Sequence, residues 1–434
     1  MSDDPFGCGV FRNSTFDVLS VEAFLNSIKE AQTETGIKFG GIAFDDCYSP
    51  SRATMIISDI FTGKLKVPSD SNPLDPSKIV GVVGPFPSGV TVPVTFLFSS
   101  IALPSISYAS TSPDLDDKDI NFPYFFRTVP SDVDQAHAML EILKTMEWYS
   151  LGLVYVNNNY GSKGKNAFKN LANAYGICII AEIEVTQENS TVGNLNAYQG
   201  LEDVRISGTN LFVYFGTEGR IVDVLAYIKE LSNAVTPYIF IGSDDWADSR
   251  NIRNTFGEMV KGSLSFKIKT RTLQTNFIEN IVHKTSSLDT AGYWYKQFFR
   301  NYFQCYFQND FVKTFPNPCP KNITISDTSG IMADGRVSHS ILAVKALTKG
   351  IAQAKQKLCN KDIEFPCHTY KRRTDIVRDD ISKVTLLDDN QISFRVFDKN
   401  GNGDIGFQIL QITKESDDFV YSEVRTNGNI PRKT

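Results

Sequence analysis

The 434-residue sequence lacks the features by which several large classes of protein are recognised. No run approaches the ~20 apolar residues that a membrane-spanning helix requires. Lysine and arginine are scattered along a chain of net charge −5, so nothing favours nucleic acid as a partner. The sequence contains no P-loop and no G-x-S-x-G, which argues against a common phosphate-binding loop and a common kind of serine nucleophile.

Histidine is also scarce, and this scarcity argues against catalysis. The four histidines are His137, His283, His339 and His368. None of them directly follows a predicted strand, where a serine nucleophile would need its base. No C-x-x-C or H-x-x-x-H pattern suggests a metal site, and no cofactor is expected. We therefore predict that the protein is not an enzyme.

Cysteine, by contrast, is present in a pattern typical of extracellular proteins. The seven cysteines are Cys8, Cys47, Cys178, Cys305, Cys319, Cys359 and Cys367. The pairs Cys305/Cys319 and Cys359/Cys367 each bracket a short polar loop, which favours local disulfides over zinc. Because the number is odd, one cysteine is either a free thiol or has a partner outside this chain.

Two further features bear on where the protein is found. N-x-S/T sequons, which fit a secreted surface, begin at Asn13, Asn189 and Asn322. The start, Met1-Ser2-Asp3-Asp4, is acidic and unlike a secretory signal, so the chain is either intracellular or a fragment. The cysteines and sequons favour an extracellular fragment.

Apolar, β-branched runs alternate with amphipathic segments along nearly the whole chain. Buried strands are predicted at 78–84, 150–156, 176–183, 210–215 and 237–242. Helices are predicted around 21–28 and at 132–145, 218–231 and 337–357, and Ser131 with Asp134 suits a capping box for the second. This alternation predicts the α/β class with parallel sheets covered on both faces. The length exceeds one sheet, so we predict two doubly wound lobes.

A stretch that looks like a calcium-binding loop is better explained as a turn. Asp398–Asp404 begins as D-x-N-x-N-G, but Ile409 stands where the loop needs a bidentate glutamate. Two Asn-Gly pairs lie between the apolar runs 392–397 and 406–410. We therefore predict a turn between strands.

Polar residues follow several predicted strands, where open α/β sheets bind their ligands. The candidates are Ser88, Ser110, Thr111, Asp132, Tyr160 and Asp244. Hydroxyls and helix N–H groups suit a carboxylate, whereas two aspartates and the face of a tyrosine suit an ammonium. Both groups together indicate an α-amino acid. The alternative is that Ser88 and Asp132 are helix caps and Thr111 is only a loop hydroxyl.

Six stretches carry a family resemblance, namely GVVGPFPSGVTV, PSISYASTSPDLDDK, YFFRTVPSDVDQAHAMLEILKTMEW, NYGSKGKNAF, YGICIIAE and IGSDDWAD. In this order and spacing they resemble the extracellular Venus-flytrap domain of class C G-protein-coupled receptors, and metabotropic glutamate receptors most closely. The resemblance runs from Gly7 to about residue 413. It implies a bilobed clamp, like type I periplasmic binding proteins, that closes on an amino acid in the interlobe cleft.

The resemblance also implies roles for individual residues. Ser88 and Thr111 match positions that hold the α-carboxylate, with Ser110 contributing its backbone. The positions around the α-ammonium are matched by Asp132, Tyr160 and Asp244. Arg336 falls where the family places a lysine on the distal carboxylate of glutamate. Serine at positions 20 and 249 replaces family arginines, and Asp245 replaces a glycine. We therefore expect weak glutamate or aspartate binding, with a neutral polar or small amino acid as competitor.

The implied domain organisation has an upper lobe of 1–127 plus 270–397 and a lower lobe of 128–269 plus 398–434. The implied disulfides are Cys8–Cys47, Cys305–Cys319 and Cys359–Cys367, and Cys178 would bond to a cysteine-rich segment absent from this chain. The family's intersubunit disulfide is not expected, because residues 64–77 contain no cysteine.

The resemblance further implies a homo- or heterodimer formed through the upper lobe, with Arg52–Ile60 and Gly89–Ser100 as its candidate helices. The apolar residues there are either interface or core, namely Met55, Ile56, Val94, Phe96, Leu97 and Phe98. The chain would lie on the extracellular side of the plasma membrane, and absent cysteine-rich and seven-helix regions would couple it to a G protein. The alternatives are a solute-binding protein for amino acids and a receptor-like interaction module with an empty pocket.

Overall fold

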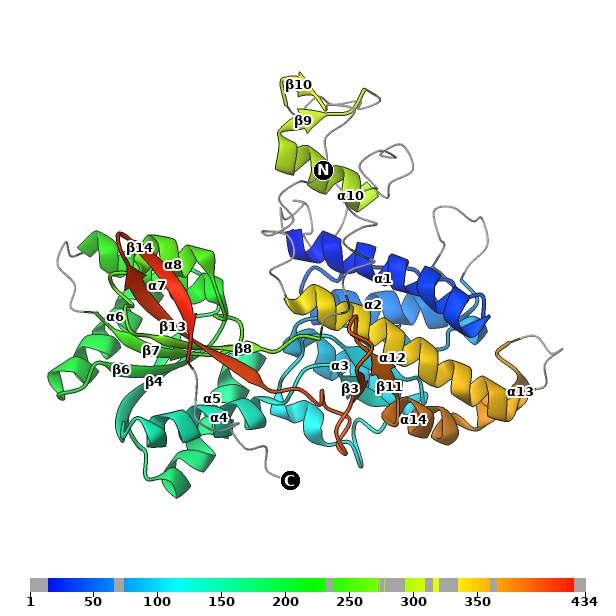
Figure 1. Ribbon diagram of the computed structural model, residues 1–434, viewed down its shortest axis with the longest axis horizontal. Helices are drawn as coiled ribbons and strands as arrows, with labels where there is room; N and C mark the ends of the chain where they lie inside the picture. The colour runs from blue at the N-terminus through cyan, green and yellow to red at the C-terminus, as the bar shows by residue number, and fades with distance from the viewer. Residues whose placement is uncertain are drawn as a thin grey trace. The chain divides into compact units, whose positions relative to one another are not determined.

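The computed structural model describes residues 15–65, 74–231, 237–271, 273, 277, 293–308, 315–319, 335–359 and 365–424 (Figure 1). The contacts divide the chain into two units. Unit 1 comprises Met1–Ser110, Lys118–Thr128 and Thr270–Asp404, and unit 2 comprises Thr111–Asp117, Val129–Lys269 and Ile405–Thr434. Neither unit is a continuous stretch of sequence. Their assignment to the upper and lower ligand-binding lobes stays a prediction.

Unit 1 is dominated by two long helices that lie side by side, α1 (Thr15–Thr35) and α12 (Gly335–Leu358) (Figure 1). Their apolar faces meet in one core, to which α1 contributes Leu19 and Ala23 and α12 contributes Ala343 and Leu347. A parallel sheet of three strands lies beside α12, in the order β1 (Val82–Val83), β2 (Ser105–Ser107), β3 (Phe125–Arg127). The strand predicted at 78–84 is thus shortened to two residues, and Lys78 belongs instead to the 3-10 turn Pro76–Lys78.

Two more helices of unit 1, α2 (Pro50–Phe61) and α3 (Ser88–Ser100), pack against each other. Burial in the structure shows which of the apolar residues on these helices, whose role the sequence left open, are core and which are exposed. Val94 and Phe98 are core, whereas Met55, Phe96 and Leu97 are exposed. The other elements in the described part of unit 1 are α10 (Tyr293–Phe303), β9 (Cys305–Tyr306), β10 (Asn317–Pro318), α13 (His368–Arg372), α14 (Thr374–Ser382), β11 (Thr385–Leu387) and β12 (Ser393–Arg395).

Unit 2 is built on a seven-stranded sheet with the order β14-β13-β8-β7-β6-β4-β5. Its strands are β4 (Ser150–Val156), β5 (Cys178–Val185), β6 (Leu211–Phe215), β7 (Ile239–Gly242), β8 (Leu264–Ile268), β13 (Phe407–Glu415) and β14 (Asp418–Glu423). The five strands from β8 to β5 are parallel, while β13 and β14 add an antiparallel edge.

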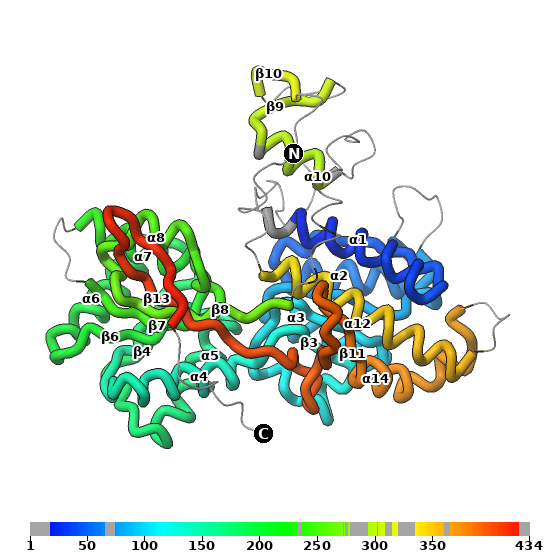
Figure 2. The backbone as a smooth tube through the Cα atoms, in the orientation of Figure 1, coloured from blue at the N-terminus to red at the C-terminus, as the bar shows by residue number. Residues whose placement is uncertain are grey.

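Helices cover both faces of this sheet, as the backbone trace in Figure 2 shows. They are α4 (Asp132–Thr145) and α5 (Asn159–Ala172) on one face, and α6 (Thr191–Ile206), α7 (Glu218–Leu231) and α8 (Arg250–Phe256) on the other. β6 shows why the sheet needs a layer of helices on each face. Its Phe212 and Tyr214 enter one core, while Val213 and Phe215 enter the other. A strand buried on both faces is apolar throughout, as the sequence predicted.

The strand predicted as buried at 176–183 differs from this expectation. In the structure it runs from Cys178 to Val185 and has alternate residues exposed, including Ile180. The reason is its place in the sheet, because within the described ranges β5 pairs with β4 alone and forms an edge.

Two local predictions are confirmed by hydrogen bonds. Ser131 accepts from Val133 N over 3.2 Å, and Asp134 Oδ2 accepts from Ser131 N over 3.3 Å, which makes the predicted capping box of α4. The predicted turn at Asp398–Asp404 is closed by the Asp398 carboxylate, which accepts from the N–H groups of Asn400 and Asn402 over 2.8 and 2.9 Å.

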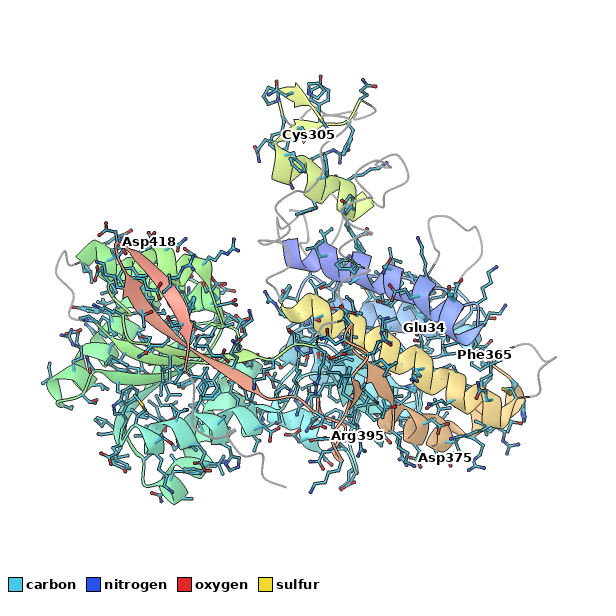
Figure 3. The ribbon with its side chains drawn as sticks, in the orientation of Figure 1. Glu34, Cys305, Phe365, Asp375, Arg395 and Asp418 are labelled. Carbon is cyan, nitrogen blue, oxygen red and sulfur yellow. A yellow bond between two sulfur atoms is a disulfide. The ribbon has the colours of Figure 1, made fainter. Side chains whose placement is uncertain are left out.

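Two of the expected disulfides are present, Cys305–Cys319 and Cys359–Cys367 (Figure 3 labels Cys305). Cys47 is also disulfide-bonded, but its expected partner Cys8 lies outside the described residues. Among the cysteines of the described ranges, Cys178 is the free one, and it is exposed.

Candidate functional site

Three of the predicted ligand residues are brought together in unit 2. Asp132 is the first residue of α4, Tyr160 lies in the first turn of α5, and Asp244 follows β7. Tyr160 donates its phenolic proton to Asp244 Oδ1 over 2.5 Å, and Gln135 Nε2 donates to the same oxygen over 3.0 Å. The Asp244 carboxylate is therefore fixed by both helices.

The sheet explains why these side chains meet. β4 and β7 are both parallel to β6, so the polar residues after each strand lie along one edge of the sheet. Gly161 lets α5 press against that edge, because a Cβ there would collide with the carbonyl oxygens of Val156 and Phe215. A larger residue at position 161 would move Tyr160 away from Asp244.

The electrostatics of this cluster favour a positive charge. Burial raises the pKa of Asp244 above its usual value, and the charge of Asp245 raises it further, although hydrogen bonds from Tyr160 and Gln135 lower it. The pKa of Tyr160 is raised well above 10.0, first by burial and then by the charges of Asp244, Asp132 and Asp245. Carboxylates that repel one another in a desolvated site are stabilised by a cation placed among them.

Gln135, which the sequence reasoning missed, adds a further acceptor to the cluster. It lies one turn along α4 from Asp132 and is buried. Its Nε2 is held by Asp244, whereas its Oε1 makes no hydrogen bond to the described residues. The spacing of three residues on one helix is the signal that could have found it, since such residues share a face.

Thr111 and Asp132 are linked directly in unit 2. Asp132 N donates to Thr111 O over 2.9 Å, and both residues are buried. The short segment that begins at Thr111 is held at its other end by Asp116, whose Oδ2 accepts from Ser131 Oγ over 2.6 Å. Thr111 is thus fixed at the start of α4, beside the first of the acidic residues.

The helix-cap alternative is wrong for Asp132 and Ser88. The capping side chain of α4 is that of Ser131, and α3 has Pro87 at its N-cap with no side-chain cap. Asp132 and Ser88 are instead the first helical residues, where the positive end of the helix dipole favours a negative charge.

Ser110 is buried in unit 1, and its polar atoms have partners there. Its hydroxyl donates to Phe86 O over 2.8 Å and shares a 2.5 Å hydrogen bond with Thr91 Oγ1. Its N–H donates to Ser107 Oγ over 3.0 Å, and its carbonyl accepts from Arg127 Nη1 over 3.2 Å. Ser110 therefore ties the loop after β2 to the start of α3, where Ser88 lies.

Arg336 lies against an aromatic ring of unit 1 that sequence reasoning did not single out. Its guanidinium carbon is 5.6 Å from the centre of the Phe86 ring, within the range of a cation–π contact. Phe86 in turn contacts Tyr48 at 5.7 Å and Tyr108 at 6.3 Å between ring centres. These residues are far apart in the sequence, so no local pattern predicted their cluster.

Two residues that depart from the family pattern have partners in unit 2. Asp245 Oδ2 accepts from the N–H of Glu218, the first residue of α7, over 2.7 Å. Ser249 caps α8 by accepting from Ile252 N over 3.1 Å, and its hydroxyl donates to Glu218. The negative charge of Asp245 is therefore partly offset by the start of a helix.

The described residues contain no cluster of three or more His, Cys, Asp or Glu arranged to hold a metal ion. Within the same ranges, no helix has the length and apolar character needed to cross a membrane. Of the histidines described, His137 shares a 3.2 Å hydrogen bond with Tyr175.

Comparison with known proteins gave matches over most of the chain. The family model for the receptor family ligand binding region matches residues 20–415. The probable metabotropic glutamate receptor mgl-1 of Caenorhabditis elegans is 31% identical over 390 residues, which cover 83% of this chain and 38% of that protein. Metabotropic glutamate receptor 4 of Mus musculus is 27% identical over 288 residues, or 65% of this chain and 31% of that protein. The matches thus span about a third of either relative.

Proposed function

From the premise that this chain belongs to the receptor family of ligand-binding regions, we propose that it is the amino-acid-sensing part of a metabotropic-glutamate-like receptor. Residues of both units contribute to recognition of one α-amino acid. The function is binding and not catalysis. The chain lies on the extracellular side of the plasma membrane, and further regions of the receptor couple it to a G protein.

The observation that carries this proposal is the cluster of acidic residues in unit 2, namely Asp132, Asp244 and Asp245. Asp244 is held by Tyr160 and Gln135, and its pKa is raised by burial. A buried acceptor such as Gln135 Oε1 costs ~1–3 kcal/mol when it has no donor. An α-ammonium brings three donors and a positive charge, so it satisfies the amide oxygen and relieves the repulsion between carboxylates at once.

The carboxylate of the ligand is assigned to Ser88 and Thr111. Ser88 begins α3, a helix of 13 residues, and helix N-termini bind anions through their N–H groups. Thr111 is held beside Asp132 by the hydrogen bond between their backbones, which would keep carboxylate and ammonium sites close together. Ser110 positions this end of the site through its bonds to Phe86 and Thr91.

The side chain of the ligand is assigned to Arg336. A guanidinium can pair with a carboxylate through two hydrogen bonds, so an acidic side chain retains one strong partner. Position 20, where the resemblance expects a second arginine, is a buried serine on α1. We therefore propose weak glutamate or aspartate binding, with neutral polar or small amino acids as competitors.

A thermal-shift screen of the twenty amino acids, followed by calorimetric titration, tests the proposal. At least one amino acid should stabilise the protein. Thr111→Ala and Asp244→Ala should each weaken its binding at least tenfold, which corresponds to about 1.4 kcal/mol. No shift with any amino acid would favour the interaction module instead, whereas tight glutamate binding would contradict only the proposed selectivity.

A further inference from the structure

One of the three sequons of this chain, Asn189-Ser190-Thr191, lies in the described part of the structure, in the turn from β5 to α6. Asn189 and Thr191 are both exposed. The turn is well formed, because Thr186 Oγ1 donates to Glu188 O over 2.8 Å and Ser190 Oγ accepts from Gly193 N over 3.0 Å as the cap of α6.

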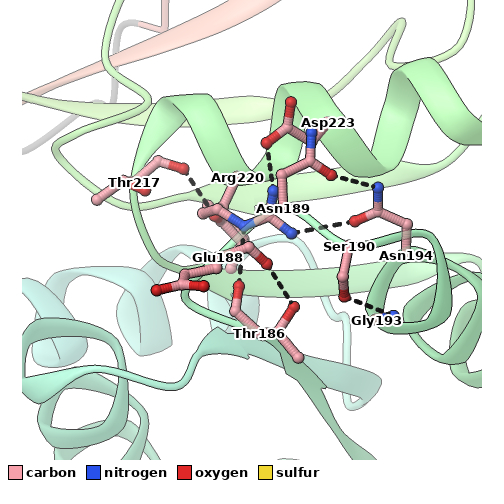
Figure 4. Close-up of polar contacts among 10 residues, drawn as sticks. Thr186, Glu188, Asn189, Ser190, Gly193, Asn194, Thr217, Arg220 and Asp223 are labelled. Atoms are coloured by element: carbon pink, nitrogen blue, oxygen red, sulfur yellow. Dashed lines mark hydrogen bonds and ion pairs between the residues drawn. The ribbon is translucent and has the colours of Figure 1, made fainter.

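A buried arginine fixes the orientation of the Asn189 side-chain amide (Figure 4). Arg220 Nη2 donates to Asn194 Oδ1 over 3.0 Å. A guanidinium can only donate, so the oxygen of the Asn194 amide must face it and the nitrogen must point the other way. That nitrogen donates to Asn189 Oδ1 over 2.9 Å. The oxygen of Asn189 is therefore turned towards the network.

Arg220 is itself firmly held, so the orientation of Asn189 rests on a rigid base. Its Nε donates to Thr186 O over 2.8 Å, and its Nη1 pairs with Asp223 on the next turn of α7. Gly193 closes the turn from the other side, because a Cβ there would collide with the Thr186 hydroxyl. The hydrogen bonds described for Asn189 use Oδ1 alone, so Nδ2 has no hydrogen-bond partner among the described residues, and the residue itself is exposed.

We propose that Asn189 carries an N-linked oligosaccharide whose first sugars cover the open edge of β5 and the adjoining groove. Transfer of the oligosaccharide to the protein forms a bond between Asn189 Nδ2 and C1 of the first sugar. The amide nitrogen gives up one proton, and a lipid diphosphate leaves as the oligosaccharide donor is consumed. The modified nitrogen keeps its second hydrogen and the amide keeps its oxygen, so the bond from Asn194 survives.

The surface next to Asn189 suits a sugar. A groove of about 350 Å³ lies between β5 and α6 and is lined by Ala181 and Glu184 on the strand and by Asn196 and Gly200 on the helix. This volume is at the lower end of small-ligand pockets, ~300–1,000 Å³. The groove also reaches Thr186 and Gly193, which bracket the sequon in the chain. Carboxylate and amide groups can bond sugar hydroxyls, while alanine and glycine accept the flat side of a ring.

A glycan at Asn189 would protect the edge of the sheet formed by β5. Among the described strands β5 pairs with β4 alone, and an unpaired strand edge is a template for unwanted pairing with another chain. Glu182 and Glu184 already place charge on this strand, with Glu182 held by Lys165 and Lys169. A hydrophilic chain attached just beyond its end would hinder a second strand from docking there.

The test uses the full chain secreted by eukaryotic cells. Peptides are analysed by mass spectrometry before and after an amidase that removes N-linked glycans and leaves aspartate. Asn189 should be recovered as aspartate only after that treatment. Thr191→Ala breaks the sequon without touching the bond between Asn189 and Asn194 and should abolish the modification, whereas Thr191→Ser keeps the sequon and should retain it. Recovery of unmodified Asn189 from the unmutated protein overturns the proposal.

The shielding role is tested on the same two variants. Light scattering at rising protein concentration should show more self-association for Thr191→Ala than for Thr191→Ser. Equal scattering from the two would overturn the shielding role even if the glycan is present. Amino-acid binding enters neither readout, so failure here is distinguishable from failure of the proposed ligand site.

Discussion

Asp244 illustrates how a residue can serve binding at the expense of stability. Its pKa is raised above the usual value of 3.8, with burial as the largest cause. As pH rises from that value through the raised pKa, the unfolded chain loses its proton first, so the free energy of unfolding falls. At pH values above the raised pKa, the ionised Asp244 therefore destabilises the protein that holds no ligand.

We predict that Asp244→Asn raises the thermal midpoint of the ligand-free protein at neutral pH and weakens amino-acid binding at least tenfold. Asparagine can still accept from Tyr160, but it cannot attract an ammonium. Differential scanning calorimetry and isothermal titration would measure the two effects. Binding to the unmutated protein should also weaken as pH falls through the raised pKa of Asp244, because protonation removes the charge that attracts the ammonium.

Asp203→Asn is the matched control, since Asp203 is an exposed carboxylate on α6 of the same unit. It should change neither the thermal midpoint nor the affinity. A lower thermal midpoint for Asp244→Asn would show that the hydrogen bonds to Asp244 outweigh its desolvation, and the proposed balance would be wrong.

The elements that sequence patterns predicted well are those buried on both faces or capped by local side chains. β4 and α4 match the predicted ranges, and β6 lies close to its own, because apolar runs and the Ser131 cap are local signals. β1 and β5 were predicted less well, since the position of a strand within a sheet depends on partners distant in sequence. The aromatic ring beside Arg336 was missed for the same reason, whereas Gln135 could have been found from its spacing to Asp132 on α4.

At the scale of an element, we predict that Ser131→Ala lowers stability and also weakens ligand binding. It removes the cap of α4 and the bond to Asp116, and loss of an N-cap typically costs ~1 kcal/mol. Because α4 carries both Asp132 and Gln135, its fraying should reduce affinity several-fold. Chemical denaturation and calorimetric titration would measure these effects.

Ser49→Ala provides the comparison, since Ser49 caps α2 in unit 1 by accepting from Arg52 N. A similar loss of stability is expected there, with no change in affinity, because α2 carries none of the assigned ligand residues. If both variants bound equally well, the cap of α4 would have no part in holding the site.

At the scale of the whole molecule, the exposed faces of α2 and α3 bear on assembly. Phe96, Leu97 and Ile101 are exposed and fall at the spacing of one helical face on and just beyond α3, while Met55 and Phe61 are exposed on α2. Clustered exposed apolar residues on packed helices are typical of interaction sites. We infer that unit 1 dimerises through this surface, and without a linking disulfide the dimer should be weak and reversible.

We predict that sedimentation will show a concentration-dependent equilibrium between monomer and dimer, and that Phe96→Glu shifts it to monomer. The side chain of Phe96 is 53% exposed, so a charge there should not disturb the core but would be desolvated in a dimer interface. Leu387→Glu is the matched control, because Leu387 is 52% exposed in the same unit but lies on β11. It should associate like the unmutated protein. A strict monomer at high concentration, or equal loss of dimer in both variants, would contradict assembly through α2 and α3.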